Sequence, residues 1–461
     1  MRISATKPLF AWDELDDSPS LQAIRDTLAT IPGHALLTAL RDRRHNGCNR
    51  YPVHVLWGVL LVAILRRHVT REACLAELRR NAGLRLVIGI EREDDVPHGW
   101  NLTRFLTFLG TEPYLGLVRE ACDVLVRALG AAVPDLGRHT AGDSTALSGK
   151  PDPHPTRVAA EVAQGLPQPS GGKKEYKDDD GVVTKIVEWF GYKLHLLVDV
   201  RHEVTLACRV TDTNAGDNER IAAPVDQAQA NLPDDRIETL AYDQAADDIK
   251  VHESLDAAGI RPVIQIRHCW PKDGEQENVL GGRIPSTSST MKPARCSATT
   301  RPTPVRRAMS YAGHERDRGT LKYRCPAIVE GFVCGSQEKC NAGNPYGMTV
   351  RVPKERDLRR FPPIPRATQQ FERRYKGRTA VERVNARLKV FWGLDDGQVT
   401  GSGRFHAHVG AVMVIHLAVA TQLAAAQRYE GSFGNMTLSP IAAAIREAMR
   451  TRAAIPAPAP G

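Results

Sequence analysis

The feature that most constrains this fold is a change of hydrophobic period near residue 138. Before that point apolar residues recur at helical spacing, so residues 1–130 are predicted to form an all-α domain. After it, the strand-like runs 191–200 and 203–210 form a hairpin, and helical and strand-like segments then alternate. This order predicts an α/β domain with flanking helices, and the hairpin makes its sheet mixed rather than purely parallel.

The distance between two acidic residues predicts an insertion in the α/β domain. Asp243 ends a strand-like run, Glu382 lies on a helical run, and 138 residues stand between them. A connection of that length requires a subdomain of its own. After the helical domain we therefore predict the first part of a catalytic core, an insertion subdomain, the second part of the core and a C-terminal tail, at 131–268, 269–365, 366–430 and 431–461. The Pro- and Gly-rich stretch 152–180 is predicted to lack regular structure, and 406–428 to be a long apolar helix that covers the sheet.

The charge distribution predicts a polyanionic partner. The chain has 62 Lys and Arg against 53 Asp and Glu, and 351–389 alone has 13 basic against 4 acidic residues. Such a run is either a solvated helix face or a surface that meets nucleic acid. The helical domain carries further basic residues, namely Arg66, Arg67, Arg71, Arg79, Arg80 and Arg85. It is either a helical bundle with a polar face or a DNA-binding domain, and we predict the latter. The nine cysteines form no tight framework and the N-terminus lacks the apolar core of a signal peptide, so we expect a cytoplasmic protein without a membrane span.

One helical face in the basic run combines an acid, two cations and a phenol. Its members are separated by three, four and seven residues, which places them on a stripe about 60° wide: Tyr375, Arg378, Glu382 and Lys389. Such a face suits a carboxylate that holds a divalent metal while Arg378 and Lys389 hold phosphate oxygens. A face of simple salt bridges is the alternative, but it does not explain the phenol.

Two further carboxylates are candidates for the same chemistry. Asp143 lies at the start of the α/β region, and Asp243 lies at a strand end, where side chains of α/β sheets project into sites. Cutting a phosphodiester without a covalent enzyme intermediate requires an activated nucleophile and a stabilised leaving oxygen, and two Mg²⁺ ions held by carboxylates supply both. We therefore predict that Asp143, Asp243 and Glu382 are the catalytic and metal-binding residues.

The spacing on the helical face resembles a known signature. The Y-R-E-K motif of insertion-sequence DDE transposases is matched, residue by residue, by Tyr375-x2-Arg378-x3-Glu382-x6-Lys389. Asp143 and Asp243 resemble the first two acids of the triad in that family. One departure is Ala246, which stands where the family often has an aromatic residue.

The resemblance implies an RNase H-like fold and a DNA transposase. Such an enzyme binds the terminal inverted repeats of an insertion sequence, cuts the DNA there and joins it to a target. Two Mg²⁺ ions, for which Mn²⁺ substitutes, and a homodimer on double-stranded DNA are implied as well. On the basic helix, DNA contacts are predicted for Tyr375, Arg378, Lys389, Lys376, Arg383 and Arg387.

The sequence is compatible with several alternatives. The chain could be a decayed, catalytically inactive copy that only binds DNA, or an RNase H-like nuclease that acts on other nucleic acid. The basic stretch 281–310 is either a flexible loop laid along DNA or a local disruption of the reading frame in a decaying element. A structural Zn²⁺ site is weakly indicated by His314, Cys325, Cys334 and Cys340. Because these lack a Cys-x2-Cys knuckle, buried free thiols are the favoured interpretation.

Overall fold

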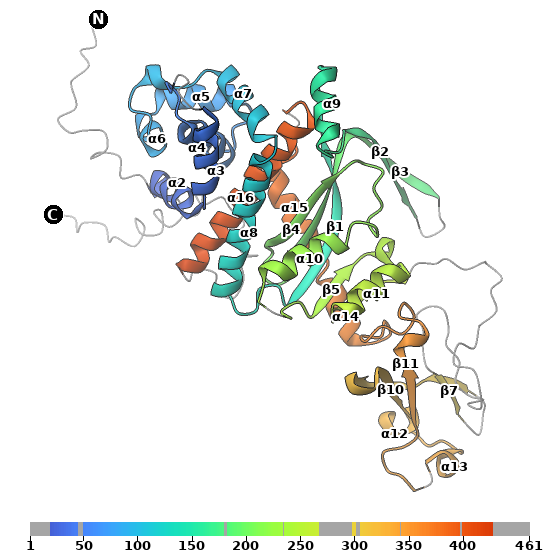
Figure 1. Ribbon diagram of the computed structural model, residues 1–461. Helices are drawn as coiled ribbons and strands as arrows, with labels where there is room; N and C mark the ends of the chain where they lie inside the picture. Colours follow the sequence, from blue (N-terminus) through green and yellow to red (C-terminus); the bar gives the residue numbers. More distant parts are fainter. Residues whose placement is uncertain are drawn as a thin grey trace, which may run out of the picture.

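The N-terminal part of the protein is helical, as predicted. The computed structural model describes residues 19–44, 49–178, 182–233, 235–266, 297–300, 305–341, 343–396 and 399–426 (Figure 1). Its first helices are α2 (Pro19–Thr30), α3 (His34–Arg44), α4 (Val53–Leu65), α5 (Arg71–Arg80), α6 (Ala82–Val87), α7 (Gly99–Leu109) and α8 (Tyr114–Ala132), with a short 3-10 turn at Glu93–Asp95. The first strand then begins at His139, which is where the hydrophobic period changes.

The centre of the molecule is a six-stranded mixed sheet. Its strands are β1 (His139–Ser148), β2 (Ser170–Lys177), β3 (Val183–Asp199), β4 (Thr205–Thr211), β5 (Thr239–Tyr242) and β6 (Arg261–Ile264). Strand β3 runs antiparallel to β1, β2 and β4, whereas β5 is parallel to both β1 and β6. The order β4-β3-β1-β5-β6 is therefore the mixed, RNase H-like arrangement that was predicted, with β2 added beside the free half of β3.

The prediction that 152–180 lacks regular structure is wrong. This stretch contains helix α9 (Pro155–Ala163), which starts with a proline at a position helices favour, and strand β2. Strand β2 is polar and shows no apolar alternation, so its sequence carries no strand signal. It forms because β3 extends past β1 and offers backbone partners there. Figure 1 shows the resulting hairpin projecting from the sheet.

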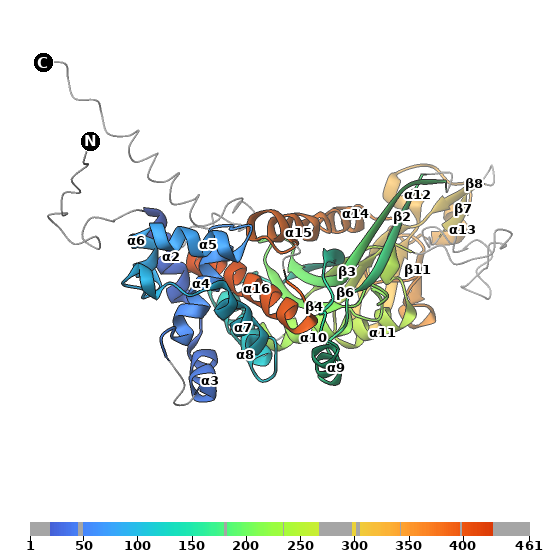
Figure 2. The same cartoon turned by 90° about the horizontal axis from the view of Figure 1, so that it is seen from above.

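Helices cover the two faces of the sheet (Figure 2). On one face α14 (Gln369–Lys376) contacts β5 and β6, and α15 (Thr379–Trp392) contacts β1 and β3. On the other face α10 (Ala222–Asn231) contacts β3 and β4, and α11 (Ile249–Ala257) contacts β6. The site described below lies where β1, β5 and α15 meet.

The long apolar helix α16 (Ser402–Ala425) joins the helical part to the sheet. It was predicted to cover the sheet, and it does contact β4 and α15, but its other neighbours are α2, α4, α7, α8 and α9 (Figure 1). One continuous hydrophobic core therefore runs from Leu21 to Ala424. Among the described helices, α16 alone is long and apolar enough to cross a membrane, and 72% of its most apolar window is buried inside the protein.

The described chain between β6 and α14 forms a separate lobe at the end of the molecule opposite the N-terminal helices (Figure 1). Its described elements are β7 (Ser297–Thr300), β8 (Val305–Ala308), β9 (Ser310–Glu315), β10 (Thr320–Arg324), α12 (Pro326–Glu330), α13 (Gln337–Asn341) and β11 (Thr349–Pro353). The sheet β11-β10-β9 has its own small core, which includes Leu321, Val352 and Phe361. Most of the basic stretch 281–310, and the whole predicted tail 431–461, lie outside the described residues.

Candidate active site

Strand register brings Asp143 and Asp243 side by side. Strands β1 and β5 are parallel neighbours, paired in register up to two residues before each acid. Because neighbouring strands are about 4.8 Å apart, the two carboxylates leave the sheet at the same level. Gly142 makes room for this arrangement, since a Cβ at that position would lie only 2.3 Å from the ring of buried Tyr242.

The helix that carries Glu382 is interrupted, whereas the sequence predicted one continuous helix. Gly377 and Arg378 separate α14 from α15, and hydrogen bonds of the tighter i→i+3 kind span the junction. The N–H of Arg378, for example, donates to the carbonyl of Tyr375 at 3.0 Å. Both junction residues keep right-handed dihedral angles, so the side chains at 375, 378 and 382 still gather on one side.

Arg378 connects the helix to the sheet. Its Nη1 lies 3.3 Å from Oδ2 of Asp143, and its Nη2 lies 2.9 Å from Oε1 of Glu382. Tyr375 stands next to this bridge: burial raises the pKa of its phenol, while the positive charge of Arg378 opposes that rise. The charge of Asp243 also acts on the phenol, so the structure gathers Asp143, Asp243, Glu382, Tyr375 and Arg378 at one place.

The negative charge of the Asp143 carboxylate is only partly balanced by the positive groups around it. Its pKa is raised to about 6, mainly by burial and further by the negative charges of Asp243 and Asp217. The backbone N–H of Ser144 and the guanidinium of Arg378 act in the opposite direction. A divalent cation with oxygen ligands would relieve this repulsion, so Asp143 and Asp243 fit a Mg²⁺-type ion.

The third predicted acid is held differently. The side chain of Glu382 is 52% exposed and its partner is Arg378. In the part of the chain that the structure describes, no three His, Cys, Asp or Glu side chains converge closely enough to hold a metal ion. Glu382 therefore meets the Asp143–Asp243 pair through the guanidinium of Arg378.

Asp217 is a member of the site that the sequence did not predict. Its Oδ1 lies 2.7 Å from Nζ of Lys193, and its Oδ2 accepts a hydrogen bond from Oγ of Ser144 at 3.1 Å. Ser144 is the neighbour of Asp143, so Asp217 is a fourth acid here, balanced by Lys193. The only sequence signal was an acid in a polar loop after a strand, which looks like an ordinary turn.

The ammonium group of Lys389 has partners within the protein. Its Nζ donates to the carbonyl of Ala146 on β1 at 2.6 Å and lies 3.3 Å from Oδ2 of Asp395. It therefore fastens α15 to β1, rather than presenting a free ammonium group to phosphate as predicted. Lys376, at the end of α14, is exposed.

The predicted DNA contact by Arg387 is not supported. Arg387 is buried, and its Nη2 lies 2.7 Å from Oε2 of the equally buried Glu203. Arg383 shares the same carboxylate at 2.5 Å, although half of its side chain is exposed. These two cations anchor α15 to the turn between β3 and β4.

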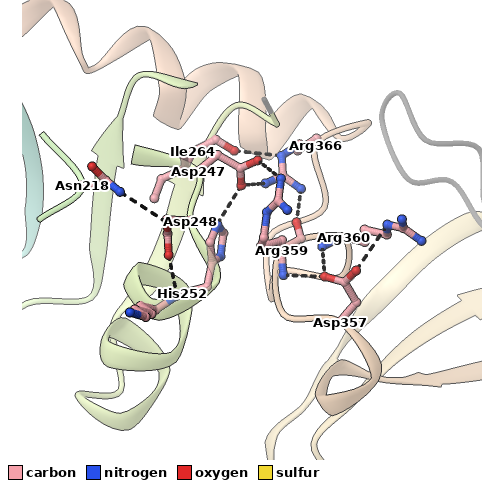
Figure 3. A network of polar contacts seen from close by, with 10 residues as sticks. Asn218, Asp247, Asp248, His252, Ile264, Asp357, Arg359, Arg360 and Arg366 are labelled. Atoms are coloured by element: carbon pink, nitrogen blue, oxygen red, sulfur yellow. Dashed lines mark hydrogen bonds and ion pairs between the residues drawn. The ribbon is translucent and has the colours of Figure 1, made fainter. Parts of the chain in front are cut away.

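The turn that carries Asp243 is fixed by a buried ion network (Figure 3). Asp247, four residues further on, has a carboxylate with no exposed surface. Its Oδ2 lies 2.7 Å from Nη2 of Arg359, and its Oδ1 lies 3.1 Å from Nε2 of His252 and 3.6 Å from Nη2 of Arg366. Both arginines belong to the segment that returns from the insertion, so that segment braces the turn from outside the sheet.

The predicted zinc candidates do not form a site among the described residues. Cys325, Cys334 and Cys340 are free cysteines. His314 lies on β9, and burial lowers the pKa of its imidazole. No cluster of ligands that includes them is present in the described part of the insertion.

Comparison with known proteins identifies the family. The family model described as a transposase DDE domain matches residues 136–418, more than half of the chain, from the start of β1 into α16. The protein belongs to the DDE-domain transposases. Among solved structures, this transposase is similar to a piggyBac transposase seen in a synaptic complex with hairpin DNA, with a TM-score of 0.36 and 10% identity over 96% of this chain and 83% of that chain. No curated protein sequence matches it.

Proposed function

We propose that this DDE-domain transposase cuts DNA at the terminal inverted repeats of an insertion sequence and joins the freed ends to target DNA. The observation that carries the proposal is the bridge from Asp143 through Arg378 to Glu382, beside Asp243. Acids from β1, β5 and α15 meet there inside the matched domain. A protein that only binds DNA has no need of clustered carboxylates, because they repel both one another and the phosphates.

In this proposal Asp143 and Asp243 hold divalent cations, Mg²⁺ or Mn²⁺, and Glu382 supplies the third carboxylate. When bound, such ions activate the attacking oxygen and stabilise the leaving oxygen of a phosphodiester. Arg378, once released from its acids, binds an oxygen of the phosphate that is cut. The phenol of Tyr375, whose pKa burial raises further above neutral pH, donates a hydrogen bond to the same phosphate.

The partners follow from the reaction. Excision requires that both ends of an element be cut together, so we propose that a homodimer acts on double-stranded DNA, in the cytoplasm. At each end of the element, a water oxygen attacks the phosphorus and the 3′ oxygen leaves as a free 3′ hydroxyl. That 3′ hydroxyl then attacks a phosphorus of the target DNA, and the target's 3′ oxygen leaves. Each step forms one P–O bond and breaks another.

The test is cleavage of a plasmid that carries this gene with its flanking DNA. The wild-type protein is compared with Glu382→Gln in Mg²⁺, Mn²⁺ and Ca²⁺. We expect paired cuts at the two ends of the element in Mg²⁺ and Mn²⁺, and none in Ca²⁺ or with Glu382→Gln. The matched control is Glu372→Gln, which makes the same change at an exposed glutamate of α14 and is expected to cut normally.

Two other outcomes of this test would contradict the proposal and favour an alternative function. Binding to the ends without any cut would indicate a decayed copy. Cuts scattered over the plasmid and lost with Glu382→Gln would indicate an RNase H-like nuclease.

A further inference from the structure

The N-terminal helices enclose a groove that is separate from the acids of the catalytic face. It has a volume of about 830 Å³ and is lined by residues of α3, α4 and α7 and of the segment between α3 and α4. Four arginines line it, namely Arg43, Arg44, Arg50 and Arg104, and none of the side chains that line it is an aspartate or glutamate. The groove therefore concentrates positive charge.

None of these arginines has an acidic partner among the described residues. Arg44 donates to the side-chain oxygen of Asn49 at 3.0 Å, and Arg50 donates to the backbone carbonyl of Asp94 at 3.2 Å. Arg43 and Arg104 are exposed and lie over the ring of Phe108, at 4.3 Å and 5.6 Å from its centre. A ring face holds a guanidinium in place but leaves its N–H donors available to an anion.

Other arginines of the N-terminal part are paired. Arg66 lies 2.6 Å from Glu77, and Arg67 reaches across to Asp396 at 2.9 Å. Arg85 donates to backbone carbonyls of α5. The basic residues in which the sequence suggested DNA binding are thus partly committed to the fold, whereas the arginines of the groove are not.

The groove also presents an apolar surface and a donor. Trp100, in the first turn of α7, is 62% exposed, which is unusual for so large an apolar side chain in a protein of this size. Beside it, Nδ2 of Asn101 is buried and has no hydrogen-bond partner among the described residues. Cations, an amide donor and an exposed ring together suit a sugar–phosphate chain, whose phosphates take the donors and whose sugars or bases take the ring.

We infer that the groove between α3, α4 and α7 binds the phosphate backbone of DNA outside the catalytic site. Arg43, Arg44, Arg50 and Arg104 contact phosphates, and Trp100 covers an adjoining sugar or base. This inference rests on the proposed function for the identity of the polyanion. It assigns to the helical part a defined surface through which the transposase holds its substrate while the acids act elsewhere.

The test is DNA binding by the full-length protein without divalent cations, so that no cutting occurs. Fluorescence anisotropy of a labelled duplex of mixed sequence is measured over a range of salt concentrations. The variant Arg43→Gln/Arg104→Gln is expected to bind about tenfold more weakly and to lower the slope of log affinity against log salt by about 2. Arg43→Lys/Arg104→Lys keeps the charge and is expected to keep most of the slope.

The matched control is Arg119→Gln/Arg127→Gln, which removes the same charge from two arginines of α8 that are paired with Glu112 and Glu120. It is expected to leave the salt slope nearly unchanged. Trp100→Ala is expected to weaken binding with the slope intact, and Trp100→Phe to restore it. Equal behaviour of the groove variant and the control would overturn the inference.

This binding experiment and the plasmid cleavage test, run on the same variants, together separate the groove from the proposed reaction. An unchanged slope in the groove variant, together with specific cleavage by the wild type, would reject the groove and leave the proposed function standing. A reduced slope without cleavage by any variant would retain the groove and reject the reaction.

Discussion

Arginines gather at two places in this transposase, and their partners differ. On α15 and its junction, Arg378 bridges Asp143 and Glu382, and Arg387 is buried against Glu203. In the groove between α3, α4 and α7, the arginines meet aromatic rings and neutral oxygens. The sequence shows both sets of arginines but not the partners of either.

The difference shows what each set of charges is for. A guanidinium that is buried against a carboxylate holds elements together, because separating the pair would leave a charge without water or partner. A guanidinium on an exposed aromatic ring costs little to keep and remains available to a ligand. Charge density alone therefore does not identify a nucleic-acid surface, and the following predictions test that distinction.

The largest expected effect is on stability, from removing a buried cation. Arg387→Met should lower the free energy of unfolding by about 3–5 kcal/mol, because Glu203 loses its buried partner. Urea denaturation measures this. Arg383→Gln changes the same carboxylate's exposed partner and should cost less than about 1 kcal/mol. Equal losses in the two variants would contradict the separation of buried from exposed pairs.

The next largest effect is stabilisation by Mg²⁺, which should depend on the acids of the catalytic face and not on the arginine groove. Mg²⁺ at about a hundred times its dissociation constant should stabilise the wild type by about 2.7 kcal/mol, since binding favours the folded state. Asp143→Asn should abolish this stabilisation, because one of the two neighbouring carboxylates is gone. Arg43→Gln should keep it in full, since no acid lines the groove. Thermal denaturation with and without the ion measures all three, and a normal response from Asp143→Asn would refute the metal site.

A pH effect on stability is expected at His416 of α16, which lies near the paired Arg387. Burial, and then the nearby charge of Arg387, lowers the pKa of His416 to about 3, and its Nε2 accepts the N–H of Thr205 at 3.2 Å. The unfolded chain takes up this proton near its ordinary pKa of 6.5. Stability from His416 is therefore present above that pH and is lost as the pH falls toward 3, by about 1.4 kcal/mol per pH unit.

The variant His416→Gln keeps an acceptor for Thr205 but cannot take up a proton. Urea denaturation at a series of pH values should show a smaller loss of stability in acid for this variant than for the wild type. Parallel curves for the two proteins would show that His416 is not the titrating group.

The smallest effect is expected in the groove. Arg43→Gln should change the free energy of unfolding by about 0.5 kcal/mol or less, because the side chain is exposed and has no acidic partner among the described residues. Urea denaturation under the conditions used for Arg387→Met measures this. A loss as large as that of Arg387→Met would show that the groove arginines are structural as well.

Much of the fold could be predicted because its signals are local. Helical spacing over the first third and the hairpin at β3–β4 follow from the order of apolar residues along the chain. Strand β2 could not be predicted from its own residues, because it forms by pairing with the part of β3 that extends past β1. The junction at Gly377 also escaped prediction, because both residues there have helical dihedral angles.

For the site, the sequence predicted which residues to examine but not how they are held. The predicted residues do gather. Helical spacing, which is local, brings Tyr375, Arg378 and Glu382 together, whereas the pairing of β1 with β5 brings Asp143 beside Asp243. Asp217 was missed because it lies in a loop, and its partner Lys193 and its neighbour Ser144 come from strands β3 and β1.

The sequence by itself determined the helical first part, the mixed sheet and the spacing that sets Arg378 against Glu382, since each depends on residues within a few turns or strands. Only the tertiary structure decided which cations are committed and which are available. Arg387 finds Glu203 across 184 residues and Arg67 finds Asp396 across 329. A charge has no preference that can be read from its neighbours in sequence, because its energy depends on which partner and how much water the folded chain brings to it.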